Sequence, residues 1–324
     1  MGVSTCVLAI DAGNSKTDVA LVGPDGTVLS TARGGGFQPP VVGVEAAVDA
    51  LGAIVGRALE EAGAPGGSVA QVSACLANAD LPVEERQLAD ALWARGWGRA
   101  VEVRNDTFAI LRAGVDVPRG VAVVCGAGIN CVGMVPDGRT ARFPALGRIS
   151  GDWGGGSGLA EEALWFAARA EDGRGEPTGL ARALPAHFGL DSMQALIEAL
   201  HLGRIGWERR LELAPVLFAT AAAGDPVAGA LVDRLAEEIV TMACVALGRL
   251  DLLDADVPVV LGGGVLAARH PQLDDRITQL LAERAPKAVV RVVTEPPVLG
   301  AALLGLDRTG AATGVHETLR AQYG

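Results

Sequence analysis

Short runs of apolar residues alternate along the chain with stretches of helical periodicity, a pattern typical of an α/β protein. The first run, residues 6–10, predicts a buried strand. Residues 19–22 and 27–31 predict two further strands, joined by a tight Gly-Pro-Asp-Gly turn. Because these connections are short, the first strands should pair antiparallel as a meander.

The next stretch alternates between helix and strand. Helical spacing covers residues 45–62 and 83–95, and two more strands are predicted at residues 72–76 and 101–103. A short helix should follow at residues 108–113. The resulting order, β-β-β-α-β-α-β and then a helix, implies a mixed sheet flanked by helices.

The pattern restarts near residue 115. Residues 121–125 predict a strand that runs into Gly-Ala-Gly-Ile-Asn, and a second hairpin follows through a Pro-Asp-Gly turn. This repeats the strand, glycine turn and hairpin of the N-terminus. We therefore predict an N-terminal domain at residues 1–114, a second domain at residues 115–306, and a tail at residues 307–324 that can pack on the first domain.

The second domain is predicted to be mostly helical. Its predicted helices are residues 159–170, 193–200, 207–223, 227–249, 271–284 and 298–306, and its later strands are residues 257–261 and 289–293. The tail should contain a short amphipathic helix.

Composition and charge exclude several classes of protein. Of 324 residues, 27 are Lys or Arg and 38 are Asp or Glu, and the net charge of −11 disfavours non-specific binding to nucleic acid or to an anionic membrane. No apolar run approaches the roughly 18 residues that cross a bilayer. The four histidines show no metal-ligand spacing. The five cysteines form no C-x-x-C pair, which favours a reducing compartment, taken here as the cytoplasm.

The turn after the first strand carries candidate phosphate chemistry. Asp11 stands at a strand end, and Gly13 and small hydroxyl or amide residues follow it. A carboxylate and backbone donors in that order can hold a hydrated Mg²⁺ and surround a terminal phosphate. The same residues are common turn formers, so an ordinary hairpin turn is the alternative.

A second candidate is Asp106, which follows a predicted strand. An acid at the carboxyl end of a strand can act as a general base. The alternative is that Asp106 caps the helix at residues 108–113. The two roles are compatible.

Two glycine-rich segments complete the candidates. Residues 147–158 contain six glycines, one Asp and one Trp, so their backbone can approach a ligand closely; a linker is the alternative. Gly262, Gly263 and Gly264 suit a strand-to-helix turn against which an adenine rests, and a dinucleotide-binding G-x-G-x-x-A turn is the alternative. Residues 219–223 are either small packing residues or a flat face for a base.

Five motifs in this order make the chain similar to the BadF/BadG/BcrA/BcrD-type branch of the acetate and sugar kinase, Hsp70 and actin superfamily. Within that branch it resembles N-acetylglucosamine kinases and actinobacterial glucosamine kinases. Residues 10–17 (IDAGNSKT) resemble the group's first phosphate motif, residues 126–130 (GAGIN) its second, and residues 261–265 (LGGGV) its adenosine motif. Residues 105–107 (NDT) fall where the family has its catalytic aspartate, and residues 151–154 (GDWG) resemble its sugar-site segment.

The resemblance implies an α/β fold of two ribonuclease-H-like, actin-like ATPase domains flanking a cleft. It also implies an ATP-dependent kinase that uses Mg²⁺ and phosphorylates the 6-hydroxyl of a small amino sugar, as a homodimer. Asp106 would be the catalytic base, and Asp11 would bind Mg²⁺ through water. The residues that would contact ATP are Asp11, Gly13, Asn14, Ser15, Lys16, Thr17, Gly126, Ala127, Gly128, Gly262, Gly263 and Gly264. Those that would contact the sugar are Gln38, Asp106, Asn130, Gly151 and Asp152.

Three positions depart from the family pattern. Ala127 replaces a hydroxyl residue of the second phosphate motif, so backbone donors must make that contact. Gln38 lies in a segment where N-acetylglucosamine kinases carry an Asn that contacts the sugar, and Trp153 replaces an acidic residue. The last two changes favour glucosamine as the acceptor, with N-acetylglucosamine as the alternative.

Three other functions stay open at this point. An ATPase that activates a radical dehydratase would need cysteines that share an iron–sulfur cluster across a dimer. A type III pantothenate kinase is suggested by the DAGNS segment. A non-catalytic, nucleotide-dependent regulator is the third alternative, although the C-x-C-G-x-x-G-C zinc site usual in ROK-type kinases and repressors does not occur in the sequence.

Overall fold

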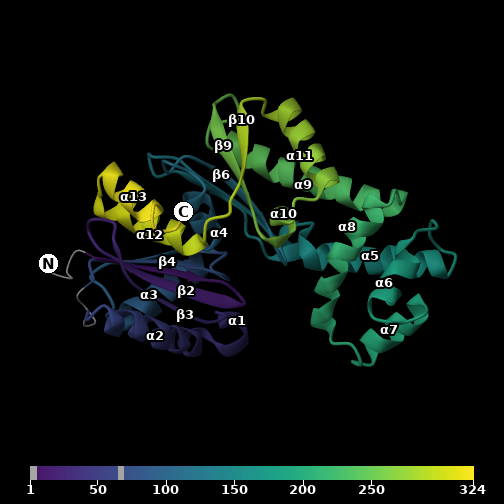
Figure 1. Ribbon diagram of the computed structural model, residues 1–324, viewed down its shortest axis with the longest axis horizontal. Coiled ribbons are helices and arrows are strands. Elements are labelled where there is room, and N and C mark those ends of the chain that lie inside the picture. Colours follow the sequence, from purple (N-terminus) through teal and green to yellow (C-terminus); the bar gives the residue numbers. More distant parts are fainter. Residues whose placement is uncertain (1–5, 65–68) are drawn as a thin grey trace. The chain divides into compact units, whose positions relative to one another are not determined.

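The computed structural model describes residues 6–64 and 69–324 (Figure 1). The chain packs as two compact units, neither of which is continuous in sequence. Unit 1 comprises Met1–Ala122, Val132–Pro144 and Val293–Gly324, and unit 2 comprises Val123–Cys131 and Ala145–Val292. The predicted segments differ from this division, because Val132–Pro144 and the residues from Val293 onward pack with the N-terminal part of the chain.

Unit 1 is built on a five-stranded sheet in the order β3-β2-β1-β4-β5. β1 (Val7–Ala12), β2 (Lys16–Val22) and β3 (Val28–Gly35) pair antiparallel as the predicted meander. β4 (Gln71–Leu76) and β5 (Val101–Asn105) continue the sheet parallel to β1. All six residues of β1, the central strand, are buried, and burial on both faces explains its unbroken apolar run.

Helices cover both faces of this sheet (Figure 1). On one face, the apolar stripe of α2 (Val44–Glu61) and the buried side of α3 (Pro82–Ala94) join the core that contains Leu8 and Ile10. Strand side chains alternate between faces, so Ser73 of β4 points to the other side, where its hydroxyl donates to the carbonyl of Ala301 at 2.7 Å.

The second face is covered by α12 (Pro297–Thr309) and α4 (Thr107–Ala113). These two helices approach so closely that a Cβ on Gly300 would lie 1.8 Å from the carbonyl oxygen of Ala109. The tail forms α13 (Thr313–Arg320), and the Gln322 side chain beyond it donates to the carbonyl of Gly26 at 2.9 Å.

The second sheet has the order β10-β9-β6-β7-β8. In both sheets the first strand of a three-stranded meander is central, and two later strands extend the sheet on its other side. This shared order matches the repeat inferred from the sequence. The strands are β6 (Gly120–Cys125), β7 (Ile129–Met134), β8 (Thr140–Arg142), β9 (Val257–Gly262) and β10 (Ala288–Val292).

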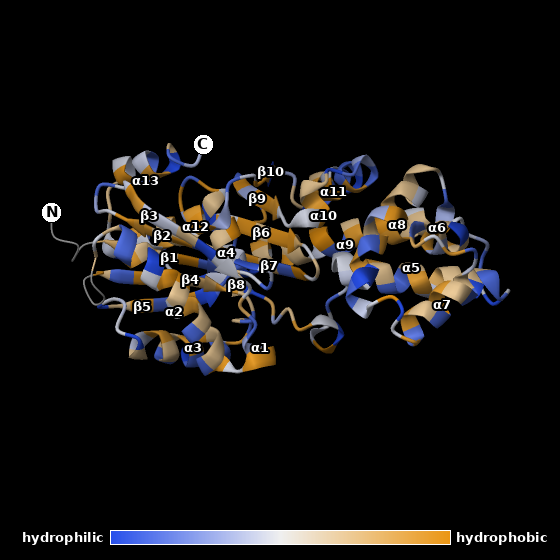
Figure 2. Ribbon diagram, turned by 60° about the horizontal axis from the view of Figure 1, so that its bottom comes forward, coloured by the Kyte–Doolittle hydropathy of each residue, from blue (hydrophilic) through white to orange (hydrophobic). Residues whose placement is uncertain are grey.

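Unit 2 contains most of the helices. They are η2 (Gly147–Ser150), α5 (Gly155–Glu171), α6 (Leu180–His187), α7 (Met193–His201), η3 (Trp207–Glu212), α8 (Leu213–Ala222), α9 (Pro226–Arg249), α10 (Gly264–Ala267) and α11 (Pro271–Arg284). Figure 2 shows β6 and β9 as hydrophobic along most of their length, whereas α5 and α7 carry bands of both kinds. The strands therefore lie in the interior, and each of these helices has one solvent-exposed face.

The predicted elements differ from the observed ones in several places. The patterns miss α1 (Pro39–Val42), α6 and α10, which are too short to show a clear period. β8 is the second strand of the hairpin predicted through the Pro-Asp-Gly turn. The helical segment predicted at residues 207–223 is confirmed, but its first six residues form the 3₁₀ helix η3 and α8 begins only at Leu213. Asp11 lies within β1 and not in the turn after it, since β1 continues to Ala12 and β2 begins at Lys16.

Among the described residues, no single helix has the length and hydropathy that a membrane span needs. One pair of helical segments, Trp207–Ala222 and Pro226–Arg249, meets these limits jointly but is bent by 112°.

Candidate functional site

Two carboxylates lie at the same edge of the sheet of unit 1. Asp11 is the fifth residue of β1, and Asp106 directly follows β5. β1, β4 and β5 run parallel, so their carboxyl ends meet at one edge, where ligands of α/β sheets commonly bind. The backbone N–H of Asp106 donates to the carbonyl of Leu76 at 3.2 Å, which ties this residue to the end of β4.

Burial makes both carboxyl groups weaker acids than usual. Desolvation, followed by the negative charges of Asp106 and Asp18, raises the pKa of Asp11 to about 7, although Lys16 opposes the shift. Desolvation also raises the pKa of Asp106 to about 6, against hydrogen bonds from Thr107 that favour its ionised form. Carboxyl groups tuned toward neutral pH are suited to proton transfer.

The same pair suits a magnesium ion. Carboxylate oxygens are the ligands that Mg²⁺ prefers, and a cation would offset the negative charge that raises the pKa of Asp11. Among the described residues no group of three or more His, Cys, Asp or Glu side chains is arranged to hold a metal.

The helix-capping alternative for Asp106 is not what the structure shows. Asp106 occupies the position before α4, but its side chain does not cap that helix. Asn105 accepts from the N–H of Thr107 at 3.0 Å and donates to Asp80 at 2.8 Å. Both the oxygen and the nitrogen of the Asn105 side-chain amide are therefore hydrogen-bonded. This fixes the residue before Asp106 and limits how far Asp106 can move.

The predicted phosphate turn is a tight loop at residues 13–15, closed by a bond from the Gly13 N–H to the carbonyl of Lys16 at 2.9 Å. Asn14, Ser15 and Lys16 are exposed and Thr17 is buried. The ammonium of Lys16 lies 3.3 Å from Asp18, so this side chain is engaged within its own strand.

The loop after β3 lies directly beside this turn. The N–H of Phe37 donates to the carbonyl of Gly13 at 2.9 Å, and the Gln38 side chain donates to the carbonyl of Asn14 at 2.8 Å. The predicted sugar contact Gln38 is thus placed next to the predicted phosphate contacts.

Sequence reasoning missed the segment after β4. Asn78 donates to the side chain of Asn14 at 2.9 Å, and Asp80 is bound by Asn105. Both are polar residues just beyond the carboxyl end of a buried parallel strand. That position was the signal available in the sequence, and it applies here as it does to Asp106.

In unit 2, the turn at residues 126–128 is held by the start of α5. The N–H groups of Gly156 and Ser157 donate to the carbonyls of Gly126 and Ala127 at 2.7 and 2.9 Å. A Cβ on Gly155, whose φ is +71°, would lie 2.6 Å from the Ala127 carbonyl oxygen, so only glycine fits there. The carbonyls of Gly126 and Ala127 are thereby engaged by α5, and the Gly126 N–H donates to the Gly128 carbonyl at 2.9 Å within the turn. The N–H groups of Ala127 and Gly128 are the donors of this turn that suit phosphate oxygens.

A largely apolar cavity of about 380 Å³ adjoins this turn. Gly126 and Ala127 form one side, and Gly264 of the predicted adenosine motif forms another. Phe218 and His270 both line the cavity with their rings stacked 3.8 Å apart and 3° from parallel. The remaining lining residues are Gly156, Leu211, Ala214, Pro215, Val265 and Ala268. Stacked rings and small residues suit a flat base.

The three glycines at the end of β9 have different surroundings. Gly262 ends the strand, and a Cβ on Gly263, whose φ is +86°, would lie 2.5 Å from the carbonyl oxygen of Cys125. Of the three, Gly264 lines the cavity. Residues 219–223 do not; the face that α8 presents to it is made by Ala214, Pro215 and Phe218, about a turn earlier.

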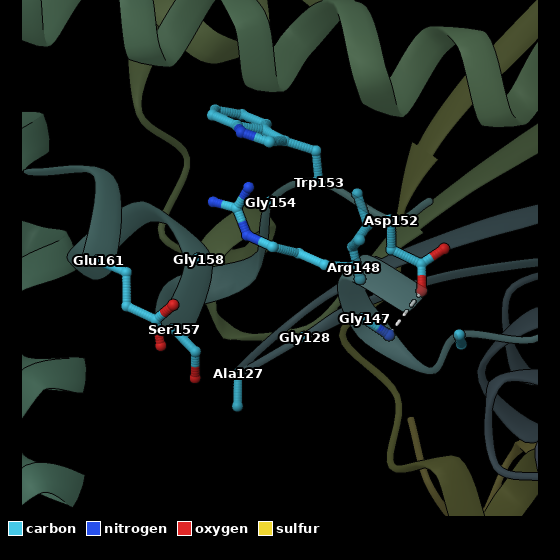
Figure 3. Close-up of a pocket in the computed structure, with 12 residues that line it drawn as sticks. Ala127, Gly128, Gly147, Arg148, Asp152, Trp153, Gly154, Ser157, Gly158 and Glu161 are labelled. Atoms are coloured by element: carbon cyan, nitrogen blue, oxygen red, sulfur yellow. Dashed lines mark hydrogen bonds between the residues drawn. The ribbon is translucent and has the colours of Figure 1, made fainter. Parts of the chain in front are cut away.

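A second cavity, of about 320 Å³, contains Asp152 (Figure 3). The Asp152 carboxylate accepts from the N–H of Gly147 at 2.9 Å and from the hydroxyl of Ser150 at 2.6 Å. Ser157 and Glu161 project from α5, and Ala127 and Gly128 of the turn also line this cavity. The two cavities of unit 2 therefore share the turn at residues 126–128.

Trp153, which stands where the family has an acid, is a packing residue of this cavity's wall. Its ring is nearly buried, and the Arg234 guanidinium lies 4.1 Å from the ring centroid. Its indole N–H and the guanidinium of Arg148 both point to Glu162, at 3.4 and 2.6 Å. The charge of Arg148 is therefore balanced within the wall.

The other predicted residues of unit 2 have local roles. Asn130 accepts from the N–H of Cys131 at 2.7 Å, and Gly151 takes a φ of +85° at the end of η2. The predicted site residues thus divide between the units. Residues 11–17, Gln38 and Asp106 belong to unit 1, and residues 126–128, Asn130, Gly151, Asp152 and residues 262–264 belong to unit 2.

The sequence is similar to a known protein family and to individual kinases. Residues 8–305 match the sequence profile of the BadF/BadG/BcrA/BcrD ATPase family. An N-acetylmuramic acid/N-acetylglucosamine kinase from Clostridium acetobutylicum is 25% identical over 301 residues, which cover 92% of this chain and 97% of the relative. An N-acetyl-D-glucosamine kinase from Dictyostelium discoideum is 26% identical over 241 residues, covering 72% of this chain and 75% of the relative.

A solved structure shows the same fold. It is a provisionally assigned N-acetylglucosamine kinase from Chromobacterium violaceum, 26% identical, with a TM-score of 0.70 and coverage of 93% of this chain and 99% of that one. The predicted fold class of two actin-like ATPase domains is thereby confirmed.

Proposed function

Because the chain belongs to the BadF/BadG/BcrA/BcrD ATPase family and its relatives are named as sugar kinases, we propose that it transfers the γ-phosphoryl group of ATP to the 6-hydroxyl of an amino sugar. The observation that carries the proposal is the pair of carboxylates, buried Asp11 and partly buried Asp106, at the carboxyl edge of the sheet in unit 1. Phosphoryl transfer to an alcohol needs a base for the hydroxyl proton and a way to balance phosphate charge.

Asp106 is the proposed base. A carboxylate with a pKa of about 6 is ionised at pH 7–8 and accepts a proton more readily than an ordinary Asp. Its neighbours Asn105 and Thr107 are joined by a hydrogen bond of 3.0 Å, which restricts the backbone on both sides of Asp106. The proton that the sugar hydroxyl loses as its oxygen attacks phosphorus would pass to a carboxylate oxygen of Asp106.

Asp11 is the proposed holder of Mg²⁺, through water. When bound, the ion would neutralise charge on the β- and γ-phosphates. The chain's own contribution is the fixed position of the Asp11 carboxylate, which lies within a central strand with both strand neighbours buried.

Unit 2 is proposed to bind the nucleotide. The cavity of about 380 Å³ would take the base against Phe218 and His270, and the backbone of residues 126–128 would contact the phosphates. Burial lowers the pKa of His270, so its ring is neutral at pH 7 and suits stacking.

Two acceptors are candidates, and different observations favour each. N-acetylglucosamine appears in the names of both relatives. Glucosamine is favoured by Asp152, whose carboxylate lines the second cavity, whereas Glu161 pairs with Arg210 and Arg148 pairs with Glu162. A carboxylate stabilises an ammonium group better than a neutral acetamide.

The rival functions have less support. Cysteines that share a cluster between two chains must reach the surface, whereas Cys6, Cys75, Cys125 and Cys131 are buried and Cys244 is partly buried. A regulator without activity would not need a base with a raised pKa, and the relatives found are named as sugar kinases.

A coupled assay of ADP release tests the proposal. The purified chain with ATP and Mg²⁺ is supplied in turn with glucosamine, N-acetylglucosamine, N-acetylmannosamine, glucose and pantothenate. Release that requires an amino sugar supports the proposal, and the larger kcat/KM identifies the acceptor. No sugar-dependent release, or release with pantothenate alone, would refute it.

A further inference from the structure

Asn78 has a backbone conformation that is unfavourable for a residue with a side chain. Its φ is +62°, and among the described residues of unit 1 it is the one non-glycine residue with a positive φ. It lies two residues beyond β4, at the sheet edge that also carries Asp11 and Asp106. Strain of this kind persists where the surrounding contacts outweigh it, and it is frequent at functional sites.

The contacts of Asn78 join two separate segments. Its Nδ2 donates to Asn14 Oδ1 at 2.9 Å and to the carbonyl of Phe37 at 3.3 Å. Asn14 belongs to the turn that the sequence predicts to contact ATP, and Phe37 precedes Gln38, the residue predicted to contact the sugar. We call residues 36–38 the acceptor loop and residues 13–15 the phosphate turn. The side-chain nitrogen of Asn78, in the segment after β4, therefore binds both of these other segments.

These two segments are already packed without space between them. Phe37 N–H donates to Gly13, and a Cβ on Gly36 would lie 2.1 Å from the carbonyl oxygen of Asn14. The Gln38 side chain adds a bond to the Asn14 carbonyl at 2.8 Å. A shift of one segment must therefore move the other, and Asn78 sets where the pair lies relative to β4.

The segment that carries Asn78 is in turn fixed to the strands of both carboxylates. Ala77 N–H donates to the carbonyl of Ala12 at 2.8 Å, which ties it to the end of the Asp11 strand. Two residues beyond Asn78, Asp80 accepts from Asn105, the neighbour of Asp106. Asn78 thus stands between the phosphate turn, the acceptor loop and the proposed base.

We propose that Asn78 is a positioning residue that holds the acceptor loop at residues 36–38 and the phosphate turn at residues 13–15, as one packed pair, at the end of β4. The proposal rests on the proposed kinase function and deepens it. Transfer between two bound substrates requires the attacking oxygen and the phosphorus in near-contact geometry, and displacements of about 1 Å are costly to rate. Asn78 keeps the two binding segments in one arrangement, and Asn tolerates the positive φ at this position better than most residues with a side chain.

The variant Asn78→Gly separates this role from simple stabilisation. Glycine adopts a φ of +62° without strain, so the variant should fold and keep a Tm no lower than that of the unchanged chain. It lacks the amide that joins Asn14 and Phe37. We expect kcat/KM for the sugar to fall at least about tenfold, with the KM for ATP changed less than about twofold.

A matched control is Asp251→Gly. Asp251 has a φ of +58°, is exposed and lies in unit 2, so the same relief of strain should leave kcat/KM unchanged. Asn14→Ala removes the partner side chain. The double variant Asn14→Ala/Asn78→Gly should lose little more activity than the single variants if the two residues act through one bond.

Amide hydrogen exchange tests the positioning without relying on catalysis. In Asn78→Gly the amides of Gly13 and Phe37 should exchange faster, while those of β1 should not. Wild-type kcat/KM in Asn78→Gly, unchanged exchange at Phe37, or an activity loss that a lowered Tm accounts for would each overturn the proposal. If the unchanged chain releases no ADP with any sugar, the proposed function fails, and the exchange result still decides whether Asn78 fixes the loop.

Discussion

Replacing Asp106 by Asn should make the protein more stable and nearly inactive. Asn has almost the same shape and can still accept from Thr107, but it carries no charge and cannot take a proton from the sugar. The two effects have separate physical origins, so each is measured on its own. Together they distinguish a base held in an unfavourable environment from a residue that stabilises the fold.

The size of the stability change follows from the pKa of Asp106. Folding raises it from 3.8 to about 6, a shift of about two units, and each unit corresponds to about 1.4 kcal/mol. Because the folded state binds the proton more tightly, stability is highest below about pH 4 and decreases as the pH rises to about 6. Above about pH 6 the folded protein bears the full free-energy cost of keeping Asp106 ionised. Asp106→Asn should therefore raise the free energy of unfolding at pH 8 by up to about 3 kcal/mol.

The loss of activity follows from the role of a base. Removing a general base lowers kcat by about 10²–10⁴, whereas the KM for ATP should change little, because the nucleotide is proposed to bind in unit 2. Sugar-dependent ADP release gives kcat, and urea unfolding at pH 8 gives stability. Asp90→Asn, the same change on the exposed side of α3, is the control and should alter neither.

Two results would refute this reasoning. A variant that keeps more than about a tenth of kcat would remove Asp106 from the role of base. A variant less stable at pH 8 than the unchanged chain would show that the carboxylate is stabilised by its surroundings, contrary to the raised pKa.

Three further predictions concern other parts of the site. Sugar-dependent kcat/KM should fall as the pH is lowered from 8 to 5, because Asp11 and Asp106 become protonated over this range as an interacting pair. A kcat/KM that does not change with pH over this range would contradict their raised pKa values. Phe218→Ala should raise the KM for ATP about tenfold with kcat little changed, since base–aromatic stacking contributes about 1–3 kcal/mol, and an unchanged KM would place the base elsewhere. Gly155→Ala should lower the free energy of unfolding by about 1–3 kcal/mol, measured in urea, because its Cβ would overlap the Ala127 carbonyl at a positive φ; unaltered stability would mean that the turn and α5 can separate.

Much of the fold could be predicted because its signals are local. The apolar run of β1 marks a strand buried on both faces, and the 3–4 spacing of Leu51, Ile54 and Val55 marks the core side of α2. The two glycine turns at similar positions after their strands predicted the repeat that appears as two sheets of the same order. Short helices could not be predicted from the sequence, because the four residues of α1 or of α10 do not complete enough turns to show a period.

The candidate site was predicted only in part. Asp106 could be singled out because it follows a strand, and the same position should have drawn attention to Asn78 and Asp80. Phe218, the residue proposed to contact the base, could not be found from its own helix, where alanines a turn later fit the pattern equally well. Lys16 carried a phosphate-binding prediction, yet its ammonium lies beside Asp18.

The sequence by itself determined the order of strands and helices, the glycine positions at tight turns, and kinship with a family of ATP-dependent enzymes. These depend on residues within a few positions of one another, whose conformations follow from local sterics and periodic burial. Tertiary structure alone decided that Asn78 donates hydrogen bonds to both Asn14 and Phe37, and that Asp11 is buried with a raised pKa. Such properties arise from groups distant in sequence that exclude water from one another, and no local pattern specifies which groups those are.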